Sequence, residues 1–176
     1  MTTRLLKGLE LTSVQGLMET CSFGKIPIPP SQIFAKSSLS FAFTNIRPFL
    51  PGHSLVSPLR VVKRFKDMTS EELVDFFAVV QVVAEALELR HDGTASSIII
   101  QDGEAAGQTI PHVHAHIIPR RANDLERPDS IYEQLENADK PNRTMEEMTV
   151  TADEIRPFID KVFNEKLVAC LREGQQ

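Results

Sequence analysis

Residues 112–119 read His112-Val113-His114-Ala115-His116-Ile117-Ile118-Pro119. Three of the five histidines in this 176-residue chain alternate there with small apolar residues. Because successive side chains of a β-strand point to opposite faces, the pattern predicts a strand with all three imidazoles on one face. The apolar face would enter a core. The histidine face would carry chemistry, since imidazole changes charge near neutral pH and can act as a nucleophile or a metal ligand.

Other segments predict the strands around this one. Residues 39–45 alternate with Leu39, Phe41, Phe43 and Asn45 on one face, which is typical of a half-buried strand. A turn at Pro51-Gly52 leads into a returning strand over 53–57. The β-branched run 96–101 predicts another strand, and a glycine-bearing turn over 102–107 joins it to the histidines. Residues 23–30 carry three prolines and predict an edge strand or a connection.

A capping box at Thr69 and Glu72 predicts the start of a long helix that ends near Arg90. This helix is apolar on two sides, so it is either sandwiched within the fold or shared with a partner subunit, and we favour the partner. One stripe comprises Leu73, Phe76, Phe77, Val80, Val83, Ala84 and Leu87. The second comprises Val74, Val79, Val82 and Ala86.

Helices are few and strands form hairpins, which predicts an α+β fold with an antiparallel sheet. A final helix is expected from Arg156 to about Glu173, with Pro157 in its first turn, where proline is tolerated. The polar residues 120–150 are expected to form a mobile loop. We interpret residues 1–20 as a loosely ordered extension and residues 21–176 as a single domain.

The composition excludes several classes of function. A net charge of −5 disfavours capture of nucleic acid, and no apolar run reaches the ~20 residues that cross a bilayer. The two cysteines, Cys21 and Cys170, match no metal or redox spacing. We expect a cytoplasmic protein, with a nuclear or organellar location also open. Glu10 and Glu19 oppose a targeting role for the first twenty residues.

The three histidines have three possible uses. Independent, solvated histidines are a poor explanation for three in alternation. A zinc ion could join His112 and His114, which lie about 6.5 Å apart along a strand, but His116 lies ~13 Å from His112, beyond the reach of one ion. No Cys, Asp or Glu follows at ligand spacing, so we predict no protein-bound metal.

Nucleophilic catalysis uses the whole motif. His114 would attack phosphorus and form a covalent intermediate that water then breaks. One ring nitrogen must be free for the attack while a backbone carbonyl holds the other, and His112 and His116 would assist the transfer. The turn at Gly107-Gln108-Thr109 supplies N–H, amide and hydroxyl groups that could cradle phosphate, and Gln101 ends the adjacent strand on the same rim.

The motif resembles the histidine triad that names the HIT superfamily of nucleotide hydrolases and transferases. Within it, the chain is most similar to the fragile histidine triad branch, the dinucleoside triphosphate hydrolases. The resemblance covers about residues 23–140. It rests on Ser40–Asn45, Pro51–His53, Ser57–Arg60, Gln101–Gly103, Ala106–Thr109, His116–Arg120 and Asp129–Tyr132.

The resemblance implies a role for each candidate site residue. His114 would be adenylylated, with His112 and His116 assisting and His53 supporting the triad from the neighbouring strand. Gln101 and the segment Gly107, Gln108, Thr109 and Ile110 would hold the phosphates, and Asn45 the ribose. Adenine would lie among Phe23, Ile28, Phe43 and Leu55. Ile26 stands where some members carry a histidine, so polar contacts there are not carried over.

The branch cleaves diadenosine triphosphate into AMP and ADP, with Mg²⁺ or Mn²⁺ bound through the substrate phosphates, and its members are homodimers whose two five-stranded sheets join. We expect the same here. One alternative is a nucleoside 5'-phosphoramidase of the histidine triad nucleotide-binding type. The absence of tryptophan and the Pro119-Arg120-Arg121 segment argue against it. Another is a dinucleotide-binding signalling protein with slow turnover, which would share the same site.

Overall fold

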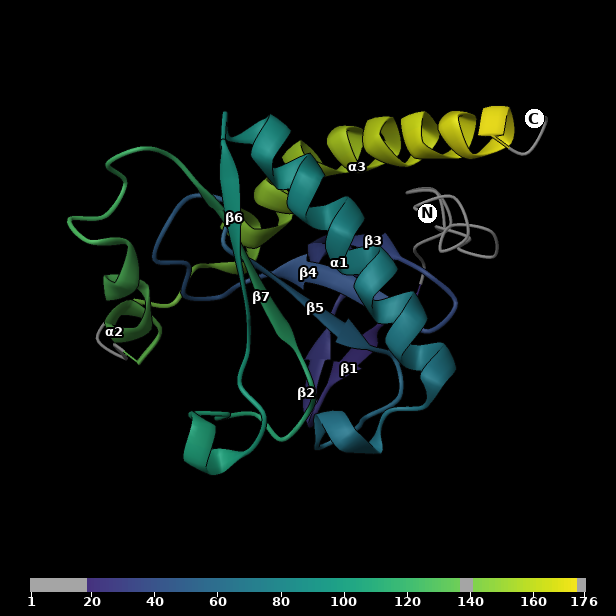
Figure 1. The fold of residues 1–176 in the computed structure, drawn as a ribbon. Coiled ribbons are helices and arrows are strands. Elements are labelled where there is room, and N and C mark those ends of the chain that lie inside the picture. Colours follow the sequence, from purple (N-terminus) through teal and green to yellow (C-terminus); the bar gives the residue numbers. More distant parts are fainter. Residues whose placement is uncertain (1–18, 137–140, 174–176) are drawn as a thin grey trace.

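The computed structural model of the chain describes residues 19–136 and 141–173 (Figure 1). Its strands are β1 (Cys21–Phe23), β2 (Ile26–Ile28), β3 (Ile33–Lys36), β4 (Ser40–Thr44), β5 (Ser54–Pro58), β6 (Ala95–Ile100) and β7 (Ala115–Arg120). Its α-helices are α1 (Ser70–Arg90), α2 (Ile131–Glu136) and α3 (Met145–Glu173). Single 3₁₀ turns occur at η3 (Pro30–Gln32), η4 (Phe65–Asp67), η5 (Glu104–Ala106) and η6 (Pro128–Ser130). The predicted α+β class is confirmed.

One antiparallel sheet of five strands, in the order β3-β4-β5-β7-β6, organises the molecule. The predicted hairpin is formed by β4 and β5, with Phe43 opposite Leu55, and β7 lies between β5 and β6. Strands β1 and β2 form a separate two-stranded hairpin. The sheet ends at β6, which offers its outer edge to no other described strand.

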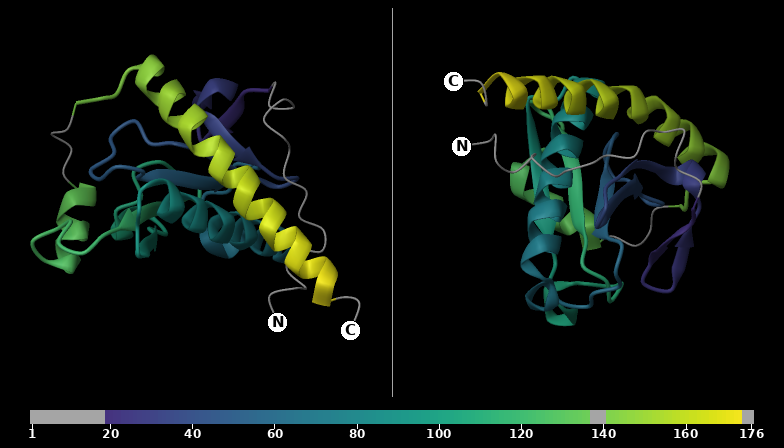
Figure 2. Two further views of the ribbon diagram at one scale, coloured as in Figure 1. Left: turned by 90° about the horizontal axis from the view of Figure 1, so that it is seen from above. Right: turned by 90° about the vertical axis from the view of Figure 1, so that its right-hand side faces the viewer.

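The two faces of the sheet carry different cores. Val113, Ala115 and Ile117 are buried in the larger core with α1 and α3, so the predicted alternation is confirmed on its apolar side. Phe41, Phe43 and Leu55 point to the other face and pack with residues of the β1–β2 hairpin. Figures 1 and 2 show α1 lying along one face of the sheet, with α3 crossing near one end of it.

The histidine strand has different bounds from those predicted. Strand β7 begins at Ala115, so His112 and His114 precede it, and it runs through Pro119 to Arg120. The pairing of β5 with β7 ends at Ile117, and Pro119 lies opposite only Ser96 of β6. A proline is tolerated there because one neighbouring strand has already ended.

Helix α1 begins with the predicted capping box. Glu72 N–H donates to Thr69 Oγ1 at 3.2 Å, and Thr69 N–H donates to a Glu72 carboxylate oxygen at 2.8 Å. Of the two expectations for this helix, burial within the fold holds for Val79, Val82 and Ala86 of the second stripe. These side chains are fully buried within the chain, because α3 packs against α1.

The last helix is longer than predicted. Helix α3 begins at Met145, so Pro157 lies in its interior and not in its first turn. A second capping box starts it, with Glu147 N–H donating to Thr144 Oγ1 and Thr144 N–H donating to the Glu147 carboxylate. Arg156 then fastens α3 to the sheet by donating to the carbonyl oxygens of Pro30, Ser31 and Ile33.

The expected mobile loop over 120–150 is only partly a loop. It contains η6, α2 and the first turns of α3, and Ile131 of α2 is buried. The expectation for residues 1–20 falls almost wholly outside the described residues. Glu19, the first of those described, pairs with Lys36. Within the described part of the chain, no helix has the length and apolar character needed to cross a membrane.

Candidate active site

The side chain of His114 is oriented by its own backbone. Its Nδ1 lies 2.7 Å from the carbonyl oxygen of His112, which can only accept a hydrogen bond, so Nδ1 carries the proton. The Nε2 atom therefore holds a lone pair. The side chain is buried beside the Phe23 ring, whose centroid is 5.0 Å away in an edge-on arrangement. This is the arrangement that the sequence predicted for a nucleophile.

His112 is fixed at both ring nitrogens and is fully buried. The backbone N–H of Gly24, in the turn between β1 and β2, donates to His112 Nδ1 at 2.9 Å. Its Nε2–H donates to the carbonyl oxygen of Arg60 at 3.2 Å. With both nitrogens committed to the protein, His112 links the β1–β2 hairpin to the loop that follows β5.

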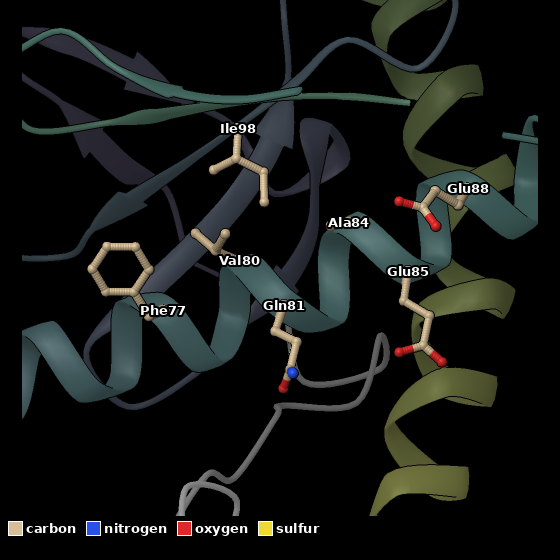
Figure 3. Close-up of a pocket in the computed structure, with 7 residues that line it drawn as sticks. All are labelled: Phe77, Val80, Gln81, Ala84, Glu85, Glu88 and Ile98. Carbon is tan, nitrogen blue, oxygen red and sulfur yellow. The ribbon is translucent and has the colours of Figure 1, made fainter. Parts of the chain in front are cut away.

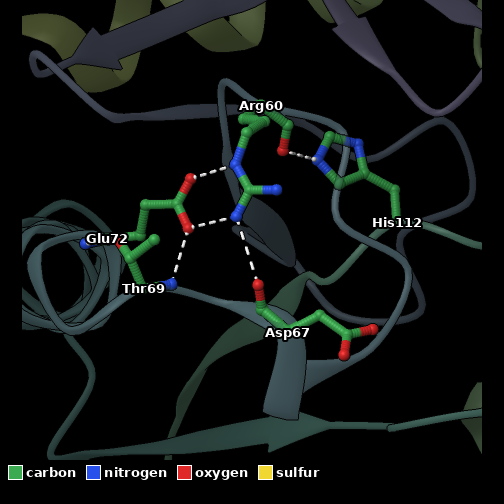
Figure 4. Close-up of polar contacts among 5 residues, drawn as sticks. All are labelled: Arg60, Asp67, Thr69, Glu72 and His112. Atoms are coloured by element: carbon green, nitrogen blue, oxygen red, sulfur yellow. Dashed lines mark hydrogen bonds and ion pairs between the residues drawn. The ribbon is translucent and has the colours of Figure 1, made fainter.

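Arg60 is in turn held by the start of α1 (Figure 4). Its guanidinium donates twice to the Glu72 carboxylate, at 2.7 Å each, and once to the carbonyl oxygen of Asp67 at 3.2 Å. The bidentate contact keeps the pKa of Glu72 below its usual range. Glu72 therefore both holds the Arg60 side chain and caps helix α1, because it also completes the capping box with Thr69. A continuous chain of polar contacts runs from the helix terminus to His112.

His116 belongs to a second group of polar side chains. Its Nδ1 lies 2.9 Å from Nε2 of His53, the residue that immediately precedes β5. Asn45 Nδ2 lies 3.1 Å from the same His53 nitrogen and 3.5 Å from His53 Nδ1. The other end of that amide is fixed, because Asn45 Oδ1 accepts the backbone N–H of Arg47 at 2.9 Å. Asn45 and His53 are both buried.

Burial keeps all three triad histidines neutral. Loss of solvation lowers the pKa of His112 and of His114, and the backbone hydrogen bonds of each oppose this only in part. The same loss of solvation, together with the neighbouring His114, lowers the pKa of His116 to about 3. A neutral imidazole keeps one lone pair, so His114 is ready to attack without first losing a proton.

The four residues assigned to adenine lie together. Phe23, Ile28, Phe43 and Leu55 form one apolar cluster on the histidine face of the sheet, and Ile110 packs against it. The Phe23 ring connects the cluster to the triad, with centroids 5.1 Å from Phe43 and 5.7 Å from His112. These side chains are closely packed on one another, and the cluster adjoins His114.

The loop before the triad places Gln101 beside Gly107. Gly107 has φ +84°, and a Cβ there would come within 2.5 Å of Gln101 Nε2, so only glycine fits. The backbone N–H groups of Gly107 and Gln108 donate to Glu104 O and Gly103 O. The Gln108 side chain bonds Gly103 N and Lys63 O. The predicted phosphate donors of residues 107 and 108 are thus used within the loop, while Thr109 stays exposed.

Three supporting contacts escaped the sequence reasoning. Arg60 acts through its carbonyl oxygen, Gly24 through its N–H, and Ser57 through its hydroxyl, which donates to Val113 O at 2.7 Å. A backbone group has no residue-type signature, so two of these contacts had no signal. The capping box at Glu72 has a local sequence signal, but the contact of Glu72 with Arg60 depends on where the loop after β5 lies.

The chain matches the HIT domain family model over residues 28–123. It is 44% identical to the bis(5'-adenosyl)-triphosphatase of Dictyostelium discoideum over 144 residues, which cover 82% of this chain and 96% of that protein. It is 50% identical to the asymmetrical bis(5'-nucleosyl)-tetraphosphatase of Schizosaccharomyces pombe over 114 residues, 65% of this chain and 62% of that one.

Among solved structures, the diadenosine triphosphate hydrolase of Plasmodium falciparum, crystallised with cyclomarin A, superposes with a TM-score of 0.75. The two chains are 31% identical, and the match covers 92% of this chain and 98% of that one. The likeness thus extends over nearly the whole of both chains.

Proposed function

The chain belongs to the HIT domain family, in its fragile histidine triad branch, and we propose that it hydrolyses dinucleoside polyphosphates, diadenosine triphosphate among them. The observation that carries the proposal is the 2.7 Å contact of His114 Nδ1 with the His112 carbonyl oxygen. It leaves Nε2 as a free lone pair beside the apolar cluster of Phe23, Phe43 and Leu55. The similarity to a bis(5'-adenosyl)-triphosphatase supports the choice of substrate.

The reaction would take two steps. In the first, His114 Nε2 attacks the α-phosphorus, a P–N bond forms, and the P–O bond to ADP breaks so that ADP leaves with its electron pair. In the second, water attacks the same phosphorus, the P–N bond breaks, and AMP leaves with one proton released. ADP is a stable anion whose terminal phosphate has a second pKa near 6, so its departure needs little help from an acid.

We expect Mg²⁺ or Mn²⁺ to assist from the substrate. The side chains around His114 offer ring nitrogens and an amide, whereas Mg²⁺ prefers oxygen ligands, which the phosphate chain supplies. Within residues 19–136 and 141–173, no group of three His, Cys, Asp or Glu side chains is placed to share an ion. The metal would neutralise the charge that develops on the departing ADP.

A second copy of the chain is the proposed partner. Helix α1 and the edge strand β6 line a groove whose apolar side chains are Phe77, Val80, Ala84 and Ile98, and Gln81, Glu85 and Glu88 also line it (Figure 3). Phe77 is 43% exposed and Ile98 47% exposed, which is costly for large apolar side chains in water. A two-fold pairing of β6 with β6 would cover both residues and join two sheets.

The test is incubation with diadenosine triphosphate and Mg²⁺, comparing wild type with His114→Asn. Wild type is expected to give AMP and ADP in equal amounts. His114→Asn should lose at least about 1,000-fold in kcat, because no covalent route remains. His91→Asn is the matched control, since His91 lies at the end of α1 and should leave turnover unchanged. A wild type that is inert here but cleaves adenosine phosphoramidate would instead support the alternative branch.

Trapping the intermediate separates the nucleophile from the substrate. Acid quenching during turnover should leave a labile adenylyl group on the wild-type protein, and peptide mapping should place it on His114. A His114→Asn variant that retains full turnover would show that the nucleophile is another group.

A further inference from the structure

We infer that Asp102 is a positioning residue for the candidate phosphate loop, residues 101–110, which its carboxylate joins to the segment 60–65. That segment also holds His112, so the contact sets the loop relative to the triad. The inference rests on the proposed function for its effect on turnover. Its structural content, the order of the loop, concerns the protein without substrate.

The backbone around Gln101 determines where its amide lies. Ile100 is opposite Ala115 in the antiparallel pairing of β6 with β7, so the next residue along β6 brings Gln101 beside His114. The Gln101 amide packs on Gly107, where a Cβ would come within 2.5 Å of Nε2. Among the described residues, the Gln101 side chain has no hydrogen-bond partner. Its place beside the nucleophile therefore depends on the residues that flank it, and Asp102 is one of them.

Asp102 is fastened to a different part of the chain. One carboxylate oxygen accepts Arg64 Nε–H at 3.0 Å and Phe65 N–H at 2.8 Å, and the other accepts Arg64 Nη2–H at 3.1 Å. The two parallel bonds from a planar guanidinium fix the plane of the carboxylate as well as its position. The bond from Phe65 adds a main-chain donor, so the attachment does not depend on a flexible side chain alone.

The rest of the loop is attached to the same segment. Gly103 N–H donates to Gln108 Oε1 at 2.8 Å, and Gln108 N–H donates to Gly103 O at 3.1 Å, so the turn closes on itself. Gln108 Nε2–H donates to Lys63 O at 3.1 Å. The Arg64 guanidinium covers Gly103, where φ is +99° and a Cβ would lie 3.1 Å from Arg64 Cζ. The loop is thus one unit with attachments at Lys63 and at residues 64–65.

The segment 60–65 also contacts the histidine strand. Arg60 O accepts His112 Nε2–H at 3.2 Å, and Val62 O accepts Val113 N–H at 2.7 Å. Val62 is itself buried in the larger core. The candidate phosphate loop and the nucleophile are therefore placed relative to one another through one short stretch of chain, and Asp102 connects the loop to it.

The charge of Asp102 makes the inference testable by its sign. A carboxylate near a phosphate site repels an anionic substrate. If Asp102 acted through its charge alone, removing it would strengthen substrate binding, and it would also release the Arg64 guanidinium to the phosphates. A positioning role predicts the opposite, because a loop that loses its attachment no longer holds Gln101 beside His114.

The experiment compares the hydrolysis of diadenosine triphosphate with Mg²⁺ by wild type and by variants. Asp102→Ala should lower kcat/KM about tenfold, because small misplacements in a site can cost up to 100-fold. Asp102→Asn should lose less, since its amide oxygen can still accept the Phe65 N–H. The double variant Asp102→Ala/Arg64→Ala should be no worse than Asp102→Ala, because the two side chains act through one contact.

Two controls separate positioning from general damage. Glu154→Ala removes another exposed ion pair, the one with Arg90, and should leave kcat/KM unchanged. Inhibition by adenosine, which has no phosphate, should be the same in wild type and Asp102→Ala. A substitution that disturbed the whole site would weaken adenosine binding as well.

Hydrogen–deuterium exchange without substrate measures the order of the loop directly. Peptides over 101–110 should exchange faster in Asp102→Ala than in wild type, while peptides from β4 and β5 should not change. The inference would be overturned by unchanged exchange over 101–110, or by a kcat/KM of Asp102→Ala that equals or exceeds that of wild type. A wild type inert towards diadenosine triphosphate would instead refute the proposed hydrolysis, and the exchange of the loop would then decide the inference alone.

Discussion

The orientation and pKa of each histidine in this site depend on the hydrogen-bond partners of its buried ring nitrogens. His114 bonds a carbonyl two residues earlier, His112 bonds a glycine N–H and a distant carbonyl, and His116 bonds another histidine. None of the three faces a carboxylate in these contacts, so burial lowers each pKa. The site therefore favours neutral imidazoles, which suits nucleophilic attack.

The lowered pKa values predict that acid destabilises the fold. Unfolded histidines bind protons below about pH 6.5, whereas folded His116 does so only near pH 3, so the unfolded state takes up more protons as the pH falls between these values. The free energy of unfolding should therefore decrease below about pH 6.5, with each such histidine contributing at most ~1.4 kcal/mol per pH unit.

Urea denaturation at pH 7.5, 6.0 and 5.0 measures this dependence. His116→Asn should show a shallower decrease than wild type, because one of the responsible groups is gone. A wild-type free energy of unfolding that is constant over this range would contradict the prediction.

At the scale of elements, the first turn of α1 both caps a helix and positions a side chain of the candidate site. Glu72 bonds Thr69 N–H on one side and the Arg60 guanidinium on the other, and Arg60 O holds His112. Thr69, by contrast, contacts only the helix end through its hydroxyl. The two halves of one capping box thus have different connections to the site.

This difference predicts different outcomes for two neighbouring substitutions. Thr69→Ala should cost about 1 kcal/mol of stability, as for other N-cap residues, and leave kcat almost unchanged. Glu72→Gln should lower kcat about tenfold, because a weakened hold on Arg60 lets His112 and the adjoining nucleophile shift, and small misplacements in a site can cost up to 100-fold. Thermal unfolding and initial rates on diadenosine triphosphate measure both effects. Equal kcat values for the two variants would show that Arg60 does not transmit position.

Some of these elements could be predicted from local sequence patterns, and others could not. Alternation at 39–45 and 112–118 and the capping box at Thr69 come from local rules, and they led to the sheet and to α1. The start of α3 was missed although Thr144 and Glu147 form the same motif, because the polar residues around them mask the helical period. The side of α1 that meets α3 could not be predicted, since it depends on where a distant helix packs. The ring nitrogen that carries the proton of a histidine, and the backbone groups that contact it, depend on differences of a few tenths of an ångström in distance. Local sequence rules do not fix such differences.

At the scale of the whole molecule, the edge of the sheet and one side of α1 remain uncovered within the described chain. Strand β6 pairs on one side only, and Phe77 and Ile98 beside it are exposed. An edge strand flanked by apolar side chains is a site at which another strand can add. The proposed homodimer would use both features.

Ile98→Lys should therefore give monomers at concentrations where wild type is dimeric, because the charge would be buried against its symmetry mate. Val150→Lys is the control, since Val150 is 51% exposed on α3 and lies outside the groove. Sedimentation velocity over a range of concentrations measures the mass. A wild type that is monomeric throughout would refute the dimer, as would an Ile98→Lys variant of unchanged mass.

The bond from His114 Nδ1 to the carbonyl two residues earlier spans a single tripeptide. The proposed nucleophile therefore takes its orienting group from its own segment of chain, and that segment is held in turn by Gly24 and Arg60 through His112. Loop residues that make none of these contacts can consequently diverge without disturbing the reactive atom. Such a division suits the recruitment of new substrates during evolution, and it makes the loop over 101–110 the natural place to graft a different specificity onto an unaltered catalytic step.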